Sequence, residues 1–330
     1  MILVLIMMQS EPELHRPLYY TQPVVLVDGI TRTGKSMLGP ILTSFQGVEL
    51  ERMEMILERI PQLYTLGKIK KDAAVALLRL EIQMKLYESM ISRNINFRKG
   101  DHSSVFSQVN PLKYLKRLIK KEGDSVVQQI LDEKPIFQVQ QHDVLGMSEI
   151  YFEALGDSLR ILEMIRHPID VIHSQYKQGY GKREGNDPRI FSFTIRHHDY
   201  LLPWTCYGIE EEYIASNQMD KVIRSYTARS DRLWETYNNL SKKQKKQVLL
   251  IPFEKFVTNP APSLEKMEHF IGRKQTKFTK KSLHQQRCPR DLNITERAQK
   301  EQEIKSLASK ECIKLMERLS QEYERIVSDL

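Results

Sequence analysis

The residues with the clearest chemical meaning lie between positions 23 and 38. A run of β-branched and apolar residues from Val24 to Val27 is typical of a buried parallel strand. Gly29 and Gly34 follow, and Lys35-Ser36 then begins an apolar stretch that indicates a helix. A strand, a glycine loop and a helix N-terminus point successive backbone N–H groups at an anion. The alternative is a turn whose glycines only meet local backbone geometry; we favour an anion-binding loop.

The same residues match a nucleotide-binding pattern. The string Gly29-x-x-x-x-Gly34-Lys35-Ser36 satisfies the Walker A motif, in which backbone N–H groups and a lysine hold phosphates. Enzymes of that class also need a carboxylate at the end of a neighbouring strand to hold magnesium. The predicted strand at 159–165 is closed by arginine rather than aspartate. This weakens a P-loop NTPase or small-molecule kinase using Mg-ATP, which we keep as the alternative function.

A second candidate anion site follows that strand. Arg166 and Ser174 lie eight residues apart, around the start of a helix that Pro168 opens. A guanidinium group and a hydroxyl suit a phosphate. Asp170 is expected to cap its own helix. The sequence therefore predicts a ligand with two anionic ends, one at Arg32–Ser36 and one at Arg166 and Ser174.

The elements that position these residues alternate between strand and helix. Further strands are predicted from Pro135 to Gln141-His142-Asp143, at 159–165 and at 248–253. Helices are predicted over 37–46, much of 49–95, 111–132, 168 onward, 220–240, 262–271 and 294 to the end. Such alternation predicts a three-layer α/β/α fold with a central parallel sheet, a P-loop-like nucleotide-binding core and helical insertions. Because ligands of such sheets bind at the carboxyl ends of the strands, the polar clusters at 32–36, 141–143 and 166–174 are expected to converge in one crevice.

Composition limits the kinds of partner. The 330 residues are 28% charged and 41% hydrophobic, and the net charge of +8 suits an anionic ligand. The basic residues are scattered, so nucleic-acid binding is not expected. Cys206, Cys288 and Cys312 form neither a disulfide framework nor a C-x-x-C metal site, which favours a cytoplasmic protein. The apolar first eight residues are too short to span a bilayer and lack a cleavage site; we expect an extra strand, or sequence upstream of a start at Met7 or Met8.

These motifs resemble those of the sulfotransferase superfamily, which uses 3′-phosphoadenosine 5′-phosphosulfate (PAPS). The family's phosphosulfate loop, Pro-Lys/Arg-Ser-Gly-Thr-Thr/Ser, is occupied by Thr31-Arg32-Thr33-Gly34-Lys35-Ser36. Its 3′-phosphate motif, a strand ending in Arg, then Asn/His-Pro-x-Asp with a Ser eight after the Arg, is matched by Arg166-His167-Pro168-Ile169-Asp170 and Ser174. Gln141-His142 falls where many members have Thr-His, and Val248–Glu254 resembles the later strand that ends in Glu. The matched motifs span about residues 23–260.

The resemblance implies a role for each matched residue. Arg32, Thr33, Gly34, Lys35 and Ser36 would bind the 5′-phosphosulfate, with Arg32 and Lys35 neutralising its charge during transfer. Arg166 and Ser174 would hold the 3′-phosphate, and Met37 takes the place of an adenine-stacking Trp. His142 would accept the proton of the acceptor hydroxyl, and Asp143 or His102 could substitute for it. The product would be adenosine 3′,5′-bisphosphate (PAP), and no metal is needed.

The resemblance leaves the acceptor and part of the cofactor site open. The family's late Arg-Lys-Gly clamp is not visible, and Arg287 and Arg290 are weak substitutes. We expect a lead-in at 1–22, then one sulfotransferase-like domain over 23–330, with insertions at about 49–110 and 178–219 on the acceptor side. The acceptor is expected to be a hydroxyl of a small molecule, carbohydrate or lipid. The expected pocket walls are Trp204, Tyr207, Glu210-Glu211-Glu212 and the polar loop 93–107, although core packing for the aromatic residues and a capping turn for the loop stay open. His197-His198 lacks the partners of a metal-ligand set.

Overall fold

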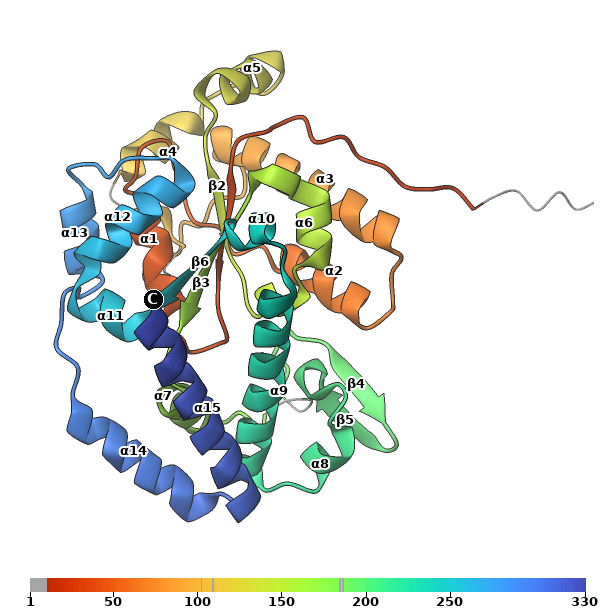
Figure 1. Cartoon of the computed structure of the whole chain (residues 1–330). Coiled ribbons are helices and arrows are strands. Elements are labelled where there is room, and N and C mark those ends of the chain that lie inside the picture. The colour runs from red at the N-terminus through yellow and green to blue at the C-terminus, as the bar shows by residue number, and fades with distance from the viewer. Residues whose placement is uncertain (1–10, 102, 109, 184, 186) are drawn as a thin grey trace, which may run out of the picture.

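Four parallel strands form the central sheet, in the order β2-β1-β3-β6 (Figure 1). The computed structural model describes residues 11–330 apart from 102, 109, 184 and 186. The strands are β1 (Val24–Asp28), β2 (Phe137–Gln140), β3 (Leu159–Ile165) and β6 (Val248–Pro252). All four predicted strands are present, and every neighbouring pair is parallel, as expected.

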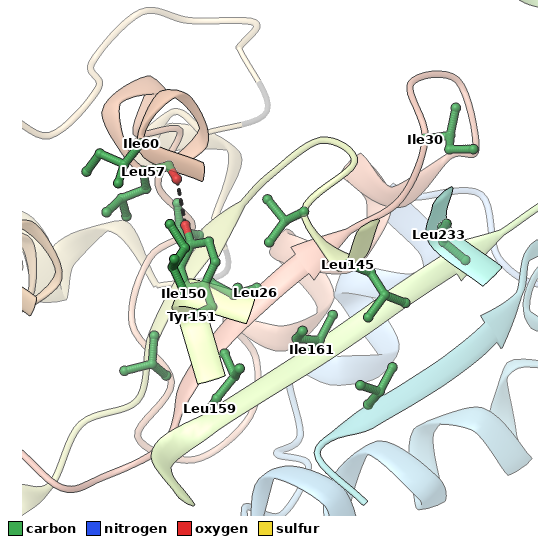
Figure 2. Close-up of a cluster of buried hydrophobic side chains, with 14 of the residues drawn as sticks. Leu26, Ile30, Leu57, Ile60, Leu145, Ile150, Tyr151, Leu159, Ile161 and Leu233 are labelled. Atoms are coloured by element: carbon green, nitrogen blue, oxygen red, sulfur yellow. Dashed lines mark hydrogen bonds between the residues drawn. The ribbon is translucent and has the colours of Figure 1, made fainter. Parts of the chain in front are cut away.

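Each face of the sheet is covered by its own apolar core, because alternate strand residues point to opposite sides. In β1, Val24 and Leu26 belong to the larger core, while Val25 and Val27 belong to the second. The larger core also holds Tyr151, whose hydroxyl donates a 2.7 Å hydrogen bond to the Leu57 carbonyl (Figure 2). Burial on both faces explains the unbroken apolar run in β1 and confirms the three-layer α/β/α class.

Helices from distant parts of the chain supply the two outer layers. The larger core is built with α2 (Met55–Thr65), α3 (Lys71–Met90), α5 (Asp124–Glu133), α6 (Glu149–Leu155), α7 (Pro168–Lys177), α9 (Gln218–Asn239), α14 (Ile294–Leu307) and α15 (Lys310–Asp329). The second core is built with α1 (Leu38–Leu42), α11 (Phe253–Thr258), α12 (Pro260–Ile271) and α13 (Thr279–Gln285). The remaining elements are α4 (Pro111–Arg117), α10 (Lys242–Lys245) and the short 3-10 turns η1 (Lys35–Met37), η2 (Val105–Ser107), η3 (Leu145–Met147), η4 (Gly156–Ser158) and η5 (Trp204–Cys206), together with the other elements of 178–219 described below.

Two helices expected from periodicity are each divided. The stretch 111–132 forms α4 and α5, and Gly123 between them has φ 116°, a backbone conformation that a helix cannot continue. The C-terminal stretch forms α14 and α15, between which the chain turns sharply (Figure 1). Ser309 caps α15 by accepting a hydrogen bond from the Cys312 N–H. The apolar periodicity extends past both breaks, so it did not indicate them.

The segment 178–219, expected as an insertion, has structure of its own. An antiparallel hairpin joins β4 (Thr194–His197) to β5 (Tyr200–Pro203), and α8 (Glu210–Ile214) follows. A small core of Leu202, Cys206 and Tyr213 lies beneath them. The strands are four residues long and half exposed, which leaves a weak sequence signal.

The described part of the lead-in, residues 11–22, runs along α3 without forming a helix or strand. Its Leu14 N–H donates to Asp72 at 2.9 Å, and Gln83 of α3 donates to the Pro17 carbonyl at 3.0 Å. The expectation of an extra strand or a later start falls on residues 1–10, outside the described residues. Among the residues that are described, no helix is both long and apolar enough to cross a membrane. The division into a lead-in and one domain stays a prediction.

Candidate functional site

The loop after β1 requires both of its glycines. Gly29 has φ 148°, and a Cβ atom there would lie 2.6 Å from the Met164 carbonyl oxygen. Gly34 has φ 95°, and its Cβ would lie 2.5 Å from the Phe253 ring. η1 and α1 start directly after the loop, so the first N–H groups of a helical segment, which lack intrahelical partners, lie at its end.

Arg32 connects the two predicted anion sites. It is exposed and has φ 80°, a left-handed conformation that is uncommon for a residue other than glycine. Its Nε atom donates to the Ser174 hydroxyl at 2.8 Å, and Arg166 Nη1 donates to the Arg32 carbonyl at 3.2 Å. The loop and the start of α7 therefore lie in direct contact at the carboxyl ends of β1 and β3, as the sequence predicted.

Lys35 is the buried lysine of the loop, and it bonds the loop's own backbone. It is buried, and its ammonium group donates to the Gly29 carbonyl. Burial lowers the pKa of Lys35, and the carboxyl groups of Asp28, Asp143, Glu58 and Glu163 oppose this shift without outweighing it. The hydrogen bond from the ammonium group to the Gly29 carbonyl therefore ties Lys35 to the start of the loop.

Two buried donors near the loop have no hydrogen-bond partner among the described residues. These are the Thr33 hydroxyl and the Nε atom of Arg166. Buried polar groups normally have partners, so both donors fit a site for an anionic ligand. Ser36 is half-buried at the start of the helical segment. Met37 is only 6% exposed and packs in the second core, so its expected contact with adenine finds no support.

A basic pocket adjoins the loop at Arg166. The Arg166 guanidinium lies 4.3 Å from the centre of the Phe253 ring, and that of Arg290 lies 5.5 Å from it. Burial lowers the pKa of Arg166, opposed by the charges of Asp170 and Glu254. The pocket, of about 130 Å³, is lined by Arg166, Asp170, Phe253, Glu254, Arg290, Leu292, Asn293, Glu296, Arg297 and Lys300. Arg287, the other residue considered for the late clamp, does not line it.

Arg297 and Lys300 were not predicted from the sequence, and Asp170 does not have its predicted role as the cap of helix α7. Its carboxylate accepts hydrogen bonds from Arg297 Nε at 3.0 Å and Lys300 Nζ at 2.9 Å. Burial would raise the pKa of Asp170, but Lys300 and Arg297 outweigh it and lower the pKa. The three-residue spacing of the two cations puts them on one face of α14, yet nothing in the sequence shows which helix they face.

Glu254 holds the same region together. Its carboxylate accepts hydrogen bonds from the His167 N–H at 3.2 Å, from Arg297 Nη2 at 3.1 Å and from the Tyr323 hydroxyl. Glu254, in the first turn of α11, thus joins α7, α14 and α15 at the edge of the basic pocket.

His142 is paired with a carboxylate that the sequence analysis did not identify. Its Nδ1 atom lies 2.8 Å from Glu58 Oε2, and its side chain is 24% exposed. Glu58 belongs to α2, 84 positions earlier in the chain, so no local pattern could reveal the pair. In the described part of the chain, the Nε2 atom has no hydrogen-bond partner. The arrangement leaves Nε2 available to exchange a proton.

The two substitutes considered for His142 differ in status. Asp143 forms an ion pair with Arg229 at 3.5 Å, so its charge is already compensated. His102 lies outside the described residues. Arg229 also donates to Gln175 at 3.0 Å, and Gln175 donates to the Thr31 carbonyl at 2.9 Å. This buried chain of contacts, also missed from the sequence, fixes the loop against α7 and α9.

The two insertions contact each other, but not all of the expected pocket walls take part. Arg59 of α2 donates to the Phe191 carbonyl of the 178–219 segment at 3.2 Å. Trp204 is 3% exposed, so it is core packing rather than a wall, whereas Tyr207 is exposed. The loop 93–107 packs with Leu50 and Tyr114. Figure 1 shows α4, which follows this loop, and the β4–β5 hairpin on opposite sides of the molecule.

Comparison with known proteins agrees with this geometry. The chain matches the sulfotransferase domain family over residues 23–314, and it belongs to that family. Its members are enzymes that transfer a sulfuryl group to an acceptor. None of the curated proteins compared with the chain matches it.

Solved sulfotransferase structures resemble the chain at low identity. The sulfotransferase domain from the curacin biosynthetic pathway is 10% identical, with a TM-score of 0.46 over 92% of this chain and 98% of that one. A sulfotransferase from Alicyclobacillus acidocaldarius is 15% identical, with a TM-score of 0.38 over 91% and 96% of the two chains.

Proposed function

We propose that this enzyme transfers the sulfuryl group of PAPS to a hydroxyl group of a small-molecule, carbohydrate or lipid acceptor and releases PAP. The observation that carries the proposal is the contact between the glycine loop and the Arg166 site, made by Arg32 and Ser174. It brings two cationic side chains, Arg32 and Arg166, together for a ligand with two phosphate-type groups. The unpartnered Thr33 hydroxyl and Arg166 Nε supply donors for such a ligand.

The residues divide between the two ends of the nucleotide. Arg32, Thr33, Gly34, Lys35 and Ser36 are assigned to the 5′-phosphosulfate. Arg166 and Ser174 are assigned to the 3′-phosphate, and Arg290 and Arg297, which line the same pocket as Arg166, are assigned to the late clamp. The adenine contacts are assigned to no residue, because Met37 is buried.

His142 is assigned as the general base. Glu58 accepts the Nδ1–H hydrogen bond, which fixes the ring and leaves Nε2 without a proton. Nε2 accepts the proton of the acceptor hydroxyl while that oxygen bonds to sulfur and the bond from sulfur to the bridging phosphate oxygen breaks. Arg32 and Lys35 stabilise the charge on the transferring and leaving oxygens; such positioning and charge stabilisation carry most of the catalysis in group transfers of this type.

Isothermal titration calorimetry tests the nucleotide assignment. We expect PAP to bind without magnesium, and Arg166→Ala and Arg290→Ala each to weaken binding by at least about tenfold, since each removes a charge-assisted contact. Arg287→Ala is the matched control, because Arg287 is close in sequence but does not line the pocket. Magnesium-dependent binding of ATP with no response to PAP would overturn the proposal in favour of a P-loop NTPase or kinase.

The base assignment is tested separately. With sulfur-labelled PAPS and a panel of alcohols, sugars and lipid alcohols, His142→Ala should lower turnover by about 10²–10⁴-fold, the usual contribution of general-base catalysis. Its affinity for PAP should stay unchanged. Full turnover in this variant would remove His142 from the mechanism without affecting the nucleotide assignment.

The acceptor side is assigned to α2 and the 178–219 segment. Their contact through Arg59 and Phe191 brings both insertions together, and α2 also carries Glu58, the partner of His142. A wall built from these two segments would therefore border the catalytic histidine. The class of hydroxyl within the proposed range is left to the panel above.

A further inference from the structure

Two adjacent histidines and a glutamate converge in the 178–219 segment. The Nε2 atom of His197 lies 2.7 Å from Glu211 Oε1, and the Nε2 atom of His198 lies 3.5 Å from the same oxygen. All three potential ligand atoms lie within 4.8 Å of one another. The sequence analysis found no third partner for the histidine pair; Glu211, at the start of α8, is that partner.

The convergence depends on a particular backbone turn. Side chains of adjacent strand residues normally point to opposite faces, so neighbouring histidines rarely reach one point. His197 ends β4 and pairs with Tyr200, which leaves His198 in the two-residue turn of the hairpin. His198 has φ 50°, and this left-handed conformation brings its ring to 4.5 Å from the His197 ring. Both imidazoles thereby direct Nε2 at one carboxylate oxygen.

We propose that His197, His198 and Glu211 bind a divalent transition-metal ion of the zinc type. Two imidazole nitrogens and one carboxylate are a donor set that zinc uses, with a water molecule completing a tetrahedron. Zinc bonds of about 2.0–2.2 Å place the ligand atoms about 3.3 Å apart, so only small side-chain movements are needed. All three side chains are at least partly exposed, so an ion can reach them from solvent.

The bound ion would act as a cross-link. It would tie the tip of the β4–β5 hairpin to α8, two elements that share a small core of Leu202, Cys206 and Tyr213 with three partly buried isoleucines against it. Because binding restricts two elements that a small core holds weakly, part of its free energy appears as stability of this segment. The proposal does not depend on the reaction assigned to the enzyme.

Untagged protein stripped with EDTA and titrated with zinc chloride provides the test. We expect one high-affinity site per chain and, with cobalt chloride, the visible absorption of tetrahedral cobalt. Glu211→Gln, which keeps the size of the side chain, and His197→Ala should each weaken zinc binding by at least about tenfold, since even outer-shell changes cost 10–100-fold. His269→Ala is the matched control, because His269 lies on α12 and bonds a backbone carbonyl.

If His197→Ala does not fold, the melting temperatures of the other proteins, measured with and without zinc, still test the proposal. Zinc should raise the melting temperature of the wild type and of His269→Ala, but not that of Glu211→Gln. Absence of a zinc site in the wild type, equal affinity in wild type and Glu211→Gln, or equal loss in His269→Ala would each overturn the proposal. The last result would mean adventitious binding to surface histidines.

Discussion

Glu49 and Glu51 are two buried carboxyl groups on one segment with opposite surroundings. Glu49 accepts hydrogen bonds from Lys113 and Arg117. Burial would raise the pKa of Glu49, but these two cations outweigh it and lower the pKa. Glu51 has no hydrogen-bond partner among the described residues, and burial raises its pKa to about 8. The folded structure therefore favours the ionised form of Glu49 and the neutral form of Glu51, although the two residues are only two positions apart.

The pH dependence of stability should separate them. In the unfolded chain Glu51 ionises near pH ~4.3, whereas in the folded protein it stays protonated up to about pH 8. Between these two values only the unfolded chain releases the proton, so the free energy of unfolding falls as pH rises toward 8. In urea unfolding, we expect the free energy of unfolding of Glu51→Gln to rise relative to that of the wild type by on the order of a few kcal/mol between pH 5 and 8. Glu49→Gln should be less stable than the wild type at pH 7, because it removes the charge that Lys113 and Arg117 bind. This difference in stability should shrink as pH falls through the lowered pKa of Glu49. Parallel curves for Glu51→Gln and wild type would contradict the prediction.

Glu58 is expected to position His142 rather than to exchange a proton itself. Glu58→Ala removes the partner of Nδ1, whereas Glu58→Gln keeps an amide oxygen that can accept the same hydrogen bond. Turnover should therefore fall less in the glutamine variant than in the alanine variant, and both losses should stay below that of His142→Ala. The measurement is kcat and KM for each variant with PAPS, beside PAP affinity by calorimetry. Equal turnover in Glu58→Ala and wild type would contradict this role.

At the scale of elements, the glycine loop depends on its contact with Phe253. In Gly34→Ala the new Cβ would meet the Phe253 ring, which also packs beneath Arg166 and Arg290. We expect PAP affinity to fall at least about tenfold, because displacing this ring moves both cations, and the left-handed φ adds about 1–2 kcal/mol of strain. Gly67→Ala is the control: Gly67 has φ 64° with nothing within 4 Å of its Cβ position, so it should lose stability but keep PAP affinity.

The elements that could be predicted from the sequence are those with a local signal. The strands were recognisable in the sequence as apolar runs, and the loop was recognisable by its two glycines, Gly29 and Gly34. The Arg166 motif was located correctly because proline and arginine mark a strand-to-helix junction. Features set by tertiary packing were missed or misjudged: the Glu58 partner of His142, the burial of Met37 and Trp204, and the α14 cations that pair with Asp170. A methionine or tryptophan can line a pocket or pack in a core, and the sequence does not distinguish the two, so the burial of these side chains could not be predicted.

At the scale of the whole molecule, the proposed nucleotide site joins the two ends of the chain. The glycine loop follows the first strand, whereas Arg297 and Lys300 belong to α14 near the C-terminus and are attached through Asp170 and Glu254. α14 contacts α7, but within 295–307 the side chains other than Ile304 lie largely at the surface. Elements that bury little apolar surface open at low free-energy cost, so α14 should exchange its amide hydrogens readily without ligand.

Hydrogen exchange with and without PAP should therefore show protection in two distant segments. PAP at 100 times its dissociation constant stabilises the folded state by about 2.7 kcal/mol, and we expect slowed exchange both in the loop at 29–36 and in α14. Helix α5, at the far end of the molecule from α14 in Figure 1, is the internal control and should change little. Arg297→Ala should keep the protection of the loop and lose that of α14. Protection confined to the loop in the wild type would mean that α14 takes no part in nucleotide binding, and that the late clamp lies elsewhere in the chain.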